Sequence, residues 1–222
     1  GIIDKYIGDA IMAYWGPPFN RDGEQTGLAS LAALDMVARL ESLRSSFPEL
    51  LGMRSAPISF DLRIGVATGE AIVGSIGSEH MMNYTVVGDT ANFAARLESA
   101  NKNYGTRILV SEATALGAAD VVEAREIDLV AMAGQGEPER IYELIGRKDQ
   151  LTDAQRELRA HFAAGLAAYR ARSWDEARRA FSQALAISPE DGPSLTFLGR
   201  IDALVAAPPP QDWDGSWRLD QK

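Results

Sequence analysis

Apolar residues in the first two thirds of the chain follow two different spacings. Between Gly23 and Phe47, leucine, alanine and valine recur at helical spacing and predict an amphipathic helix. Gly88-Asp89-Thr90 is predicted to open a second helix that runs to about Lys102, with Asp89 or Thr90 as its N-cap. Shorter apolar runs predict strands, two of them within residues 2–15 and the others at 62–67, 71–76, 84–87, 107–110, 121–129 and 140–145.

Two glycine-containing dipeptides lie between predicted strands. Gly8-Asp9 favours a tight hairpin between the first two strands, and Gly69-Glu70 is a second hairpin signal. Strands that alternate with amphipathic helices indicate an α/β protein of the α+β sandwich type, with helices packed on a mixed sheet.

The sequence changes character after Arg147. Residues 152–206 are almost entirely helix-forming, and their small and aromatic residues follow a spacing that resembles a tetratricopeptide repeat. So few repeats do not bury their own apolar faces, so this tail is expected to pack against the domain at 1–147 or against a partner. Residues 207–222 are predicted to be extended, with Trp213 and Trp217 docked onto a surface.

Composition restricts the possible chemistry. The 222 residues contain no cysteine, two histidines and a net charge of -9. Disulfides and thiolate metal sites are therefore excluded, and any metal is expected to be held by oxygen ligands. The negative charge argues against a nucleic-acid partner. No apolar run reaches the length that a membrane span needs. Because Gly1 lies directly in an apolar segment, the start is interpreted as a truncation within a domain.

Two long motifs carry a resemblance to a known family. They are DKYIGDAIMA at residues 4–13 and NYTVVGDTANFAARLE at residues 83–98, with LRIGVATG at 62–69 between them. Residues 1–146 resemble the class III adenylate and guanylate cyclase catalytic domain. The resemblance implies a ferredoxin-like mixed sheet and conversion of ATP to cyclic AMP and pyrophosphate. In that reaction the ribose 3′-hydroxyl attacks the α-phosphate, assisted by two Mg²⁺ or Mn²⁺ ions per site.

The resemblance assigns roles to three residues of these motifs. Asp9, at a predicted hairpin tip, corresponds to a metal-binding aspartate, and a carboxylate suits such a hard cation. Asn92 and Arg96 lie four apart, hence on one helix face. In the family this pair orients the ribose and stabilises the phosphate in the transition state. Without the motifs, Asp9 could equally be a turn residue, and the pair would more often be a solvated surface pair.

Base choice depends on two further positions. By resemblance, Lys5 contacts the purine, and Thr85 stands where many adenylate cyclases have aspartate. Threonine there resembles a bacterial and soluble subgroup specific for ATP, some of whose members respond to bicarbonate. A hydroxyl can accept a hydrogen bond from the adenine amino group, but it can also donate one. Taken alone, Lys5 would most often be an exposed strand lysine and Thr85 a strand filler.

The resemblance also implies a head-to-tail homodimer. In it, Lys5, Thr85, Asn92 and Arg96 face Asp9 of the second copy. The family's other metal aspartate lies on a first strand that has no counterpart here, so the fragment is expected to be inactive and poorly stable alone. Two basic residues that many relatives carry are also missing, at Met132-Ala133-Gly134 and in residues 78–82, where His80 is the only basic side chain. Weaker phosphate binding, or supply of the charge from elsewhere, is therefore expected.

Three interpretations of function remain open. The first is a homodimeric adenylate cyclase of bacterial signal transduction. The second is a catalytically degenerate domain that regulates or binds nucleotide, and the third is a guanylate cyclase. The tail resembles that of membrane-anchored bacterial receptor cyclases. The fragment is therefore expected to be cytoplasmic, with a parent protein attached to the inner membrane through its missing N-terminal part.

Overall fold

The structure is a computed structural model that describes residues 1–44, 46, 49, 52, 61–78, 81–132 and 137–219. The strands are β1 Ile2–Ile7, β2 Ala10–Tyr14, β3 Ile64–Val66, β4 Ile72–Ser78, β5 Met81–Val87, β6 Ile108–Ser111, β7 Val122–Met132, β8 Glu139–Arg147 and β9 Trp217–Leu219. The helices are α1 Gln25–Arg44, α3 Asp89–Tyr104, α4 Glu112–Gly117, α5 Asp153–Arg170, α6 Trp174–Ile187 and α7 Gly192–Ala206.

A five-stranded mixed sheet forms the centre of the molecule. Its strand order is β3-β6-β8-β7-β9. β3 is parallel to β6 and β9 is parallel to β7, whereas β8 is antiparallel to both of its neighbours. The α/β class with helices on a mixed sheet is therefore confirmed. Two separate two-stranded sheets, β1-β2 and β4-β5, complete the strands of the described residues.

One of the two predicted hairpins is wrong. Gly69-Glu70 was expected to join two paired strands, but β3 pairs with β6 in the central sheet and β4 pairs with β5. The dipeptide instead links two sheets. The Gly8-Asp9 hairpin is confirmed, because β1 and β2 are antiparallel and Gly8 has a φ of 63°, which a glycine adopts without strain.

The two faces of the central sheet support two apolar cores. β6 contributes to both, because successive side chains of a strand point to opposite faces. Leu109 belongs to the core formed with α3 and with α5 to α7, whereas Ile108 and Val110 belong to the core formed with α1 and α4. Leu109, Ile127 and Ile141 are completely buried in the first core.

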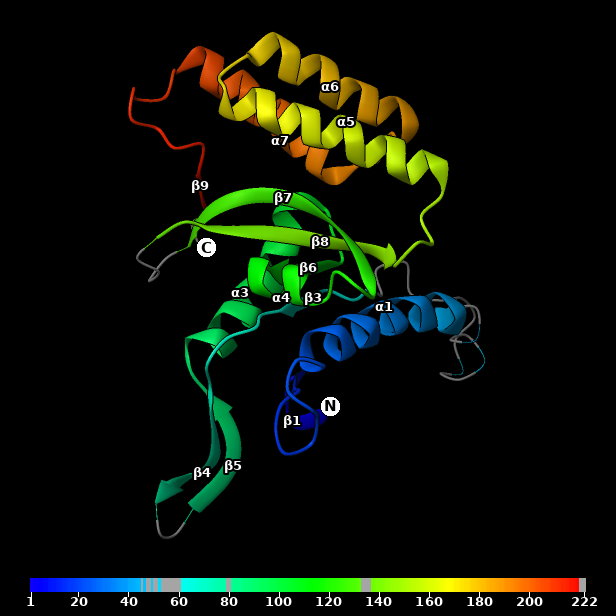
Figure 1. The fold of residues 1–222 in the computed structure, drawn as a ribbon, viewed down its shortest axis with the longest axis vertical. Coiled ribbons are helices and arrows are strands. Elements are labelled where there is room, and N and C mark those ends of the chain that lie inside the picture. The colour runs from blue at the N-terminus through cyan, green and yellow to red at the C-terminus, as the bar shows by residue number, and fades with distance from the viewer. Residues whose placement is uncertain are drawn as a thin grey trace.

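The tail forms three helices, of which α5 and α7 lie over β7 and β8 while α6 packs on them on the side away from the sheet (Figure 1). Phe162, Phe181 and Phe197 from the three helices are in mutual contact, with ring centroids 5.2 to 5.8 Å apart. These rings belong to the same core as the sheet residues. Of the two expected surfaces, the main domain or a partner, the tail packs against the main domain.

The C-terminal segment packs on the tail helices and the central sheet through Trp213 and Trp217, as predicted. Trp213 contacts Tyr169 at a ring distance of 5.4 Å, and the guanidinium of Arg200 lies 4.3 Å from the Trp217 ring. Trp217 also begins β9, which adds a parallel strand at the edge of β7. The sequence predicted an extended segment here, but it did not predict this pairing.

The starts of two helices, α3 and α4, differ from what the sequence predicted. The cap expected at Asp89 or Thr90 is wrong, because Gly88 is the N-cap of α3 and makes no side-chain hydrogen bond. Its φ of 148° lets the chain turn directly from β5 into the helix. The short helix α4 was not predicted. Ser111 caps it by accepting a hydrogen bond from the backbone N–H of Thr114.

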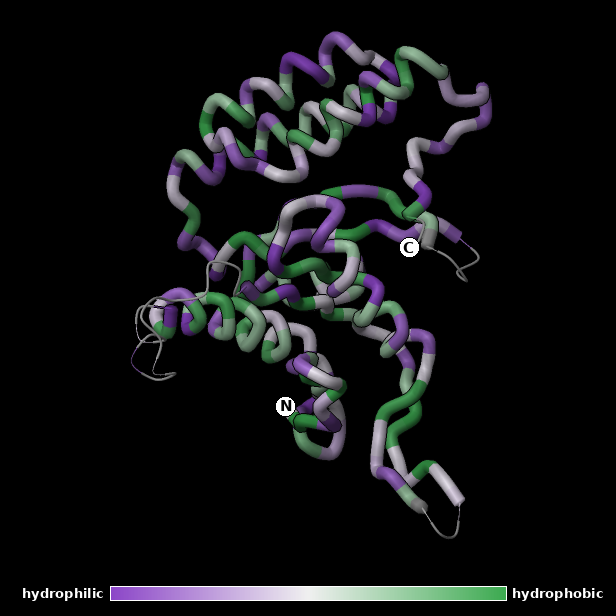
Figure 2. The backbone as a smooth tube through the Cα atoms, turned by 180° about the vertical axis from the view of Figure 1, so that it is seen from behind, coloured by the Kyte–Doolittle hydropathy of each residue, from purple (hydrophilic) through white to green (hydrophobic). Residues whose placement is uncertain are grey.

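The β4-β5 ribbon projects away from the helical layer, and apolar colouring runs along it (Figure 2). Ile72 is 70% exposed, and Met82 and Tyr84 are each 58% exposed. Ile3 and Tyr6 of β1 are also largely exposed. Large exposed apolar patches on soluble domains typically mark interaction surfaces. Among the described residues, no helix is both long and apolar enough to cross a membrane.

Candidate active site

Asp9 lies in the turn between β1 and β2. The residue is exposed, and within the described part of the chain its carboxylate makes no ion pair or hydrogen bond. A carboxylate with free oxygens at a hairpin tip is suited to a hard divalent cation. The described residues contain no group of three acidic or histidine side chains that could hold a metal ion together. Asp9 would therefore need further ligands from elsewhere.

Lys5 of β1 and Thr85 of β5, strands of two different sheets, meet at a third residue, Asp4. The Thr85 hydroxyl donates a hydrogen bond to Oδ2 of Asp4 at 2.7 Å. The Lys5 ammonium lies 3.7 Å from the same oxygen. The Asp4 side chain is only 1% exposed, and Thr85 is 6% exposed. The structure thus connects the two residues expected at the base through one buried carboxylate.

The position of Asp4 depends on an irregularity in β1. Ile3 pairs with Ala13 and Lys5 pairs with Met12, so Asp4 is an extra residue on its strand. Successive side chains of a regular strand point to opposite faces of the sheet. A β-bulge interrupts this alternation and can change the direction of a side chain. Sequence reasoning did not identify Asp4, because no residue pattern in this segment signals the bulge.

Asn92 and Arg96 lie on α3, which follows β5 directly after Gly88. Asn92 is exposed and Arg96 is half-buried. Among the described residues, no carboxylate pairs with Arg96, although Glu98 two positions on binds Arg63 at 3.0 Å. An arginine without a carboxylate partner keeps its full donor set for phosphate oxygens.

A cavity of about 440 Å³ lies at the junction of β5 and α3. Glu70, Ala71 and Ile72 form one wall, and Val87 and Gly88 form the other. The Thr90 hydroxyl donates to the Glu70 carbonyl at 2.7 Å and fixes this wall to the first turn of α3. The cavity is widely open to solvent, and none of the residues with a predicted role lines it.

Known proteins give an independent comparison. Residues 4–146 match the family described as "Adenylate and Guanylate cyclase catalytic domain". The chain belongs to this family. Residues 158–191 of this cyclase-family chain match the tetratricopeptide repeat, in agreement with the spacing found in the tail.

Two relatives show how much of a cyclase the chain covers. The terminal-differentiation specific adenylate cyclase of Dictyostelium discoideum is 32% identical over 205 residues, which are 90% of this chain and 9% of that protein. Adenylate cyclase 1 of Rhizobium meliloti is 35% identical over 147 residues, 66% of this chain and 21% of that protein. The chain therefore spans only a small part of these relatives.

Solved cyclases share the fold. The adenylyl cyclase CyaB from P. aeruginosa is 28% identical, with a TM-score of 0.57, over 68% of this chain and 74% of that one. The guanylyl cyclase Cya2 is 29% identical, with a TM-score of 0.55, over 68% of this chain and 73% of that one. Cyclases named for either nucleotide are therefore similar to this chain.

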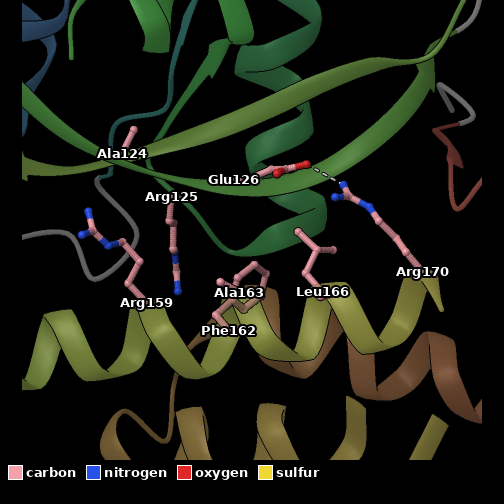
Figure 3. A pocket seen from close by; sticks show the side chains of 9 residues that line it. Ala124, Arg125, Glu126, Arg159, Phe162, Ala163, Leu166 and Arg170 are labelled. Atoms are coloured by element: carbon pink, nitrogen blue, oxygen red, sulfur yellow. Dashed lines mark hydrogen bonds and ion pairs between the residues drawn. The ribbon is translucent and has the colours of Figure 1, made fainter. Parts of the chain in front are cut away.

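A second cleft, of about 340 Å³, lies between β7 and α5 (Figure 3). Its charged residues are already paired. Arg170 donates to Glu126 at 2.6 Å, and Arg125 lies over the Phe162 ring while it binds Asp191 at 2.6 Å. This cleft is part of the contact between tail and sheet, and it is distant in the fold from Lys5 and Thr85.

The two segments in which phosphate-binding charges are missing lie largely outside the described residues. Ala133 and Gly134, Glu79 and His80 are not part of the described ranges. The prediction of weaker phosphate binding from these segments therefore stays a prediction.

Proposed function

We propose that this chain is the catalytic domain of an adenylate cyclase that converts ATP to 3′,5′-cyclic AMP and pyrophosphate. The observation that carries the proposal is the grouping of the motif residues. Lys5 and Thr85 meet at Asp4, and α3 continues from the strand that carries Thr85. This helix holds Arg96, which pairs with no carboxylate of the described residues. Membership of the cyclase family and the similarity to named adenylate cyclases support it.

Each residue has a distinct role in this proposal. Lys5 and Thr85 contact the purine base. Asn92 orients the ribose, and Arg96 neutralises charge that develops on the α-phosphate as the 3′-hydroxyl attacks. Asp9 contributes oxygen ligands to Mg²⁺ or Mn²⁺, two per site. When bound, these ions polarise the phosphate and stabilise the attacking and leaving oxygens.

The proposed active unit is a head-to-tail homodimer. In it, Asp9 of one copy faces Lys5, Thr85, Asn92 and Arg96 of the other. The exposed apolar side chains of β1 and of the β4-β5 ribbon support this arrangement, because they lie on the strands that carry Lys5 and Thr85. Sedimentation of the protein should show a dimer, and Tyr84→Arg should shift it towards monomer.

The decisive experiment uses a fusion, called the parent protein below, in which a first cyclase strand with its metal aspartate is joined before Gly1. Cyclic AMP formation is measured with Mg-ATP and with Mn-ATP. Activity should be lost in Asp9→Ala and kept in Asp22→Ala, a control at an exposed position before α1. We expect the 222-residue chain alone to be inactive. No product from a folded dimeric parent would refute the proposal and favour the regulatory, nucleotide-binding alternative.

A guanylate cyclase is the second candidate, because the solved guanylyl cyclase Cya2 is as similar as the adenylyl cyclase CyaB. The ratio of kcat/KM for ATP and for GTP decides between the two. A ratio above one supports the adenylate cyclase, and a ratio below one supports the guanylate cyclase.

A further inference from the structure

The hydrogen bond between Thr85 and Asp4 determines which way the threonine hydroxyl points. A hydroxyl has one hydrogen to donate and two lone pairs that accept. A carboxylate accepts only, so the 2.7 Å contact commits the Thr85 hydrogen to Oδ2 of Asp4. Only the lone pairs of Thr85 then remain for another partner.

A hydroxyl restricted to accepting discriminates between the two purines. Adenine carries an amino group at position 6, which donates, whereas guanine carries an oxygen there, which accepts. An acceptor at Thr85 matches the first and repels the second. Because Thr85 is only 6% exposed, an unmatched group there cannot be compensated by bulk water.

We propose that Asp4 is the positioning residue that makes this site selective for an adenine nucleotide. It acts by holding Thr85 as a hydrogen-bond acceptor towards the base. The inference rests on the proposed cyclase function and adds to it a residue that the family motif does not assign. Asp4 does not touch the base and acts on base choice through Thr85, while the Lys5 ammonium lies 3.7 Å from the same oxygen.

The geometry of β1 supports a specific role for Asp4. The bulge at this position turns the side chain towards β5, and the carboxylate is 1% exposed. Burying a carboxylate costs free energy unless it is paired and hydrogen-bonded. Here Thr85 and Lys5 provide that compensation, so a change at Asp4 alters the two residues expected at the base.

The test compares kcat/KM for ATP and for GTP in the parent protein described above. Asp4→Asn places an amide beside Thr85 that can donate to it, which frees the hydroxyl to donate to a guanine oxygen. The ATP/GTP ratio should fall about tenfold. Asp4→Ala should also lower the ratio. Asp22→Asn, the matched control on the surface, should leave it unchanged.

A double-variant comparison separates positioning from general damage. In Thr85→Val the hydroxyl is absent, so adding Asp4→Asn should change the ATP/GTP ratio no further, whatever it does to the absolute rate. Circular dichroism confirms that each variant is folded.

One outcome would overturn the role of Asp4, and another would overturn the proposed cyclase function. Active Asp4→Asn and Asp4→Ala variants that both keep the wild-type ATP/GTP ratio would overturn the role of Asp4 and leave the cyclase function standing. A folded parent without turnover of either nucleotide would overturn the proposed function, and the inference with it.

Discussion

Arg200 of α7 and Asp128 of β7 form an ion pair that is buried in the contact between the tail and the sheet. Their side chains are 6% and 1% exposed. The Tyr104 hydroxyl of α3 donates a hydrogen bond at 2.6 Å to Oδ2 of Asp128, the oxygen that also pairs with Arg200. Three elements therefore meet at one carboxylate. Burial raises the pKa of Asp128, and Arg200 and Tyr104 oppose this shift. The pair makes the tail a structural part of the cyclase-family domain.

Removing Arg200 should destabilise the protein strongly. Arg200→Met leaves the Asp128 carboxylate buried without its cation, which costs about 3–5 kcal/mol of unfolding free energy. Arg178→Met is the matched control, because Arg178 pairs with Asp202 on the surface, where the side chains are 37% and 68% exposed. It should cost about 0–1 kcal/mol. Urea unfolding followed by circular dichroism measures both, and equal losses would contradict the argument.

The double variant Arg200→Met/Asp128→Leu tests the same pair in a second way. Replacing both charges with apolar side chains leaves no unpaired ion in the core. Its loss of stability should therefore be smaller than that of Arg200→Met alone. A larger loss would indicate that the hydrogen bonds that Asp128 accepts from the Tyr104 hydroxyl and the Leu129 N–H matter more than the unpaired charge.

Two helical glycines of the tail should respond oppositely to alanine. A Cβ at Gly165 of α5 would lie 2.6 Å from the Phe181 ring, so Gly165→Ala should destabilise the contact between α5 and α6. A Cβ at Gly199 of α7 would meet nothing within 4 Å. Gly199→Ala should raise stability by up to about 1 kcal/mol, because alanine favours the helix. Thermal unfolding of both variants checks the signs.

Stability should depend on pH through Glu123 of β7. A hydrogen bond from Arg159 of α5, at 2.7 Å, lowers the pKa of Glu123, with further contributions from Asp149 and Lys148. A lowered folded-state pKa gives stability that is present above the unfolded pKa of about 4.3 and is lost as pH falls through the folded value. Glu123→Gln should therefore be less stable than the wild type at pH 7.

The difference between wild type and Glu123→Gln should shrink below about pH 4, where the wild-type carboxylate becomes protonated. Urea midpoints of both proteins from pH 3 to pH 8 give this curve. A difference that stays constant over the whole range would show that the ionic contact with Arg159 contributes nothing.

Arg96 should affect turnover without affecting the fold. Arg96→Ala removes a donor proposed to stabilise the transition-state phosphate, and it should lower kcat of the parent protein about a hundredfold. Lys102→Ala, at an exposed position in the last turn of the same helix, is the control and should keep kcat. Unfolding curves should be alike for both variants. Loss of fold and activity together in Arg96→Ala would assign the residue a structural role.

The sequence by itself determined the features that depend on local patterns. Apolar spacing predicted α1, Gly88-Asp89-Thr90 predicted the start of α3, and the Gly8-Asp9 turn predicted the β1-β2 hairpin, because these elements form from neighbouring residues. The two motifs identified the family, and the roles that they imply for Asp9, Asn92 and Arg96 stay predictions. The repeat-like spacing also predicted a helical tail that packs rather than stands alone.

Only the tertiary structure decided which distant segments meet. Gly69-Glu70 has the composition of a hairpin turn, yet β3 pairs with β6 because a strand's partner is set by long-range packing. The pairing of β9 with β7 and the burial of Arg200 against Asp128 join residues far apart in the chain. Asp4 contacts Thr85, 81 residues away in the chain, because a β-bulge orients its side chain towards that residue. The local spacing of apolar and polar residues does not predict such a contact.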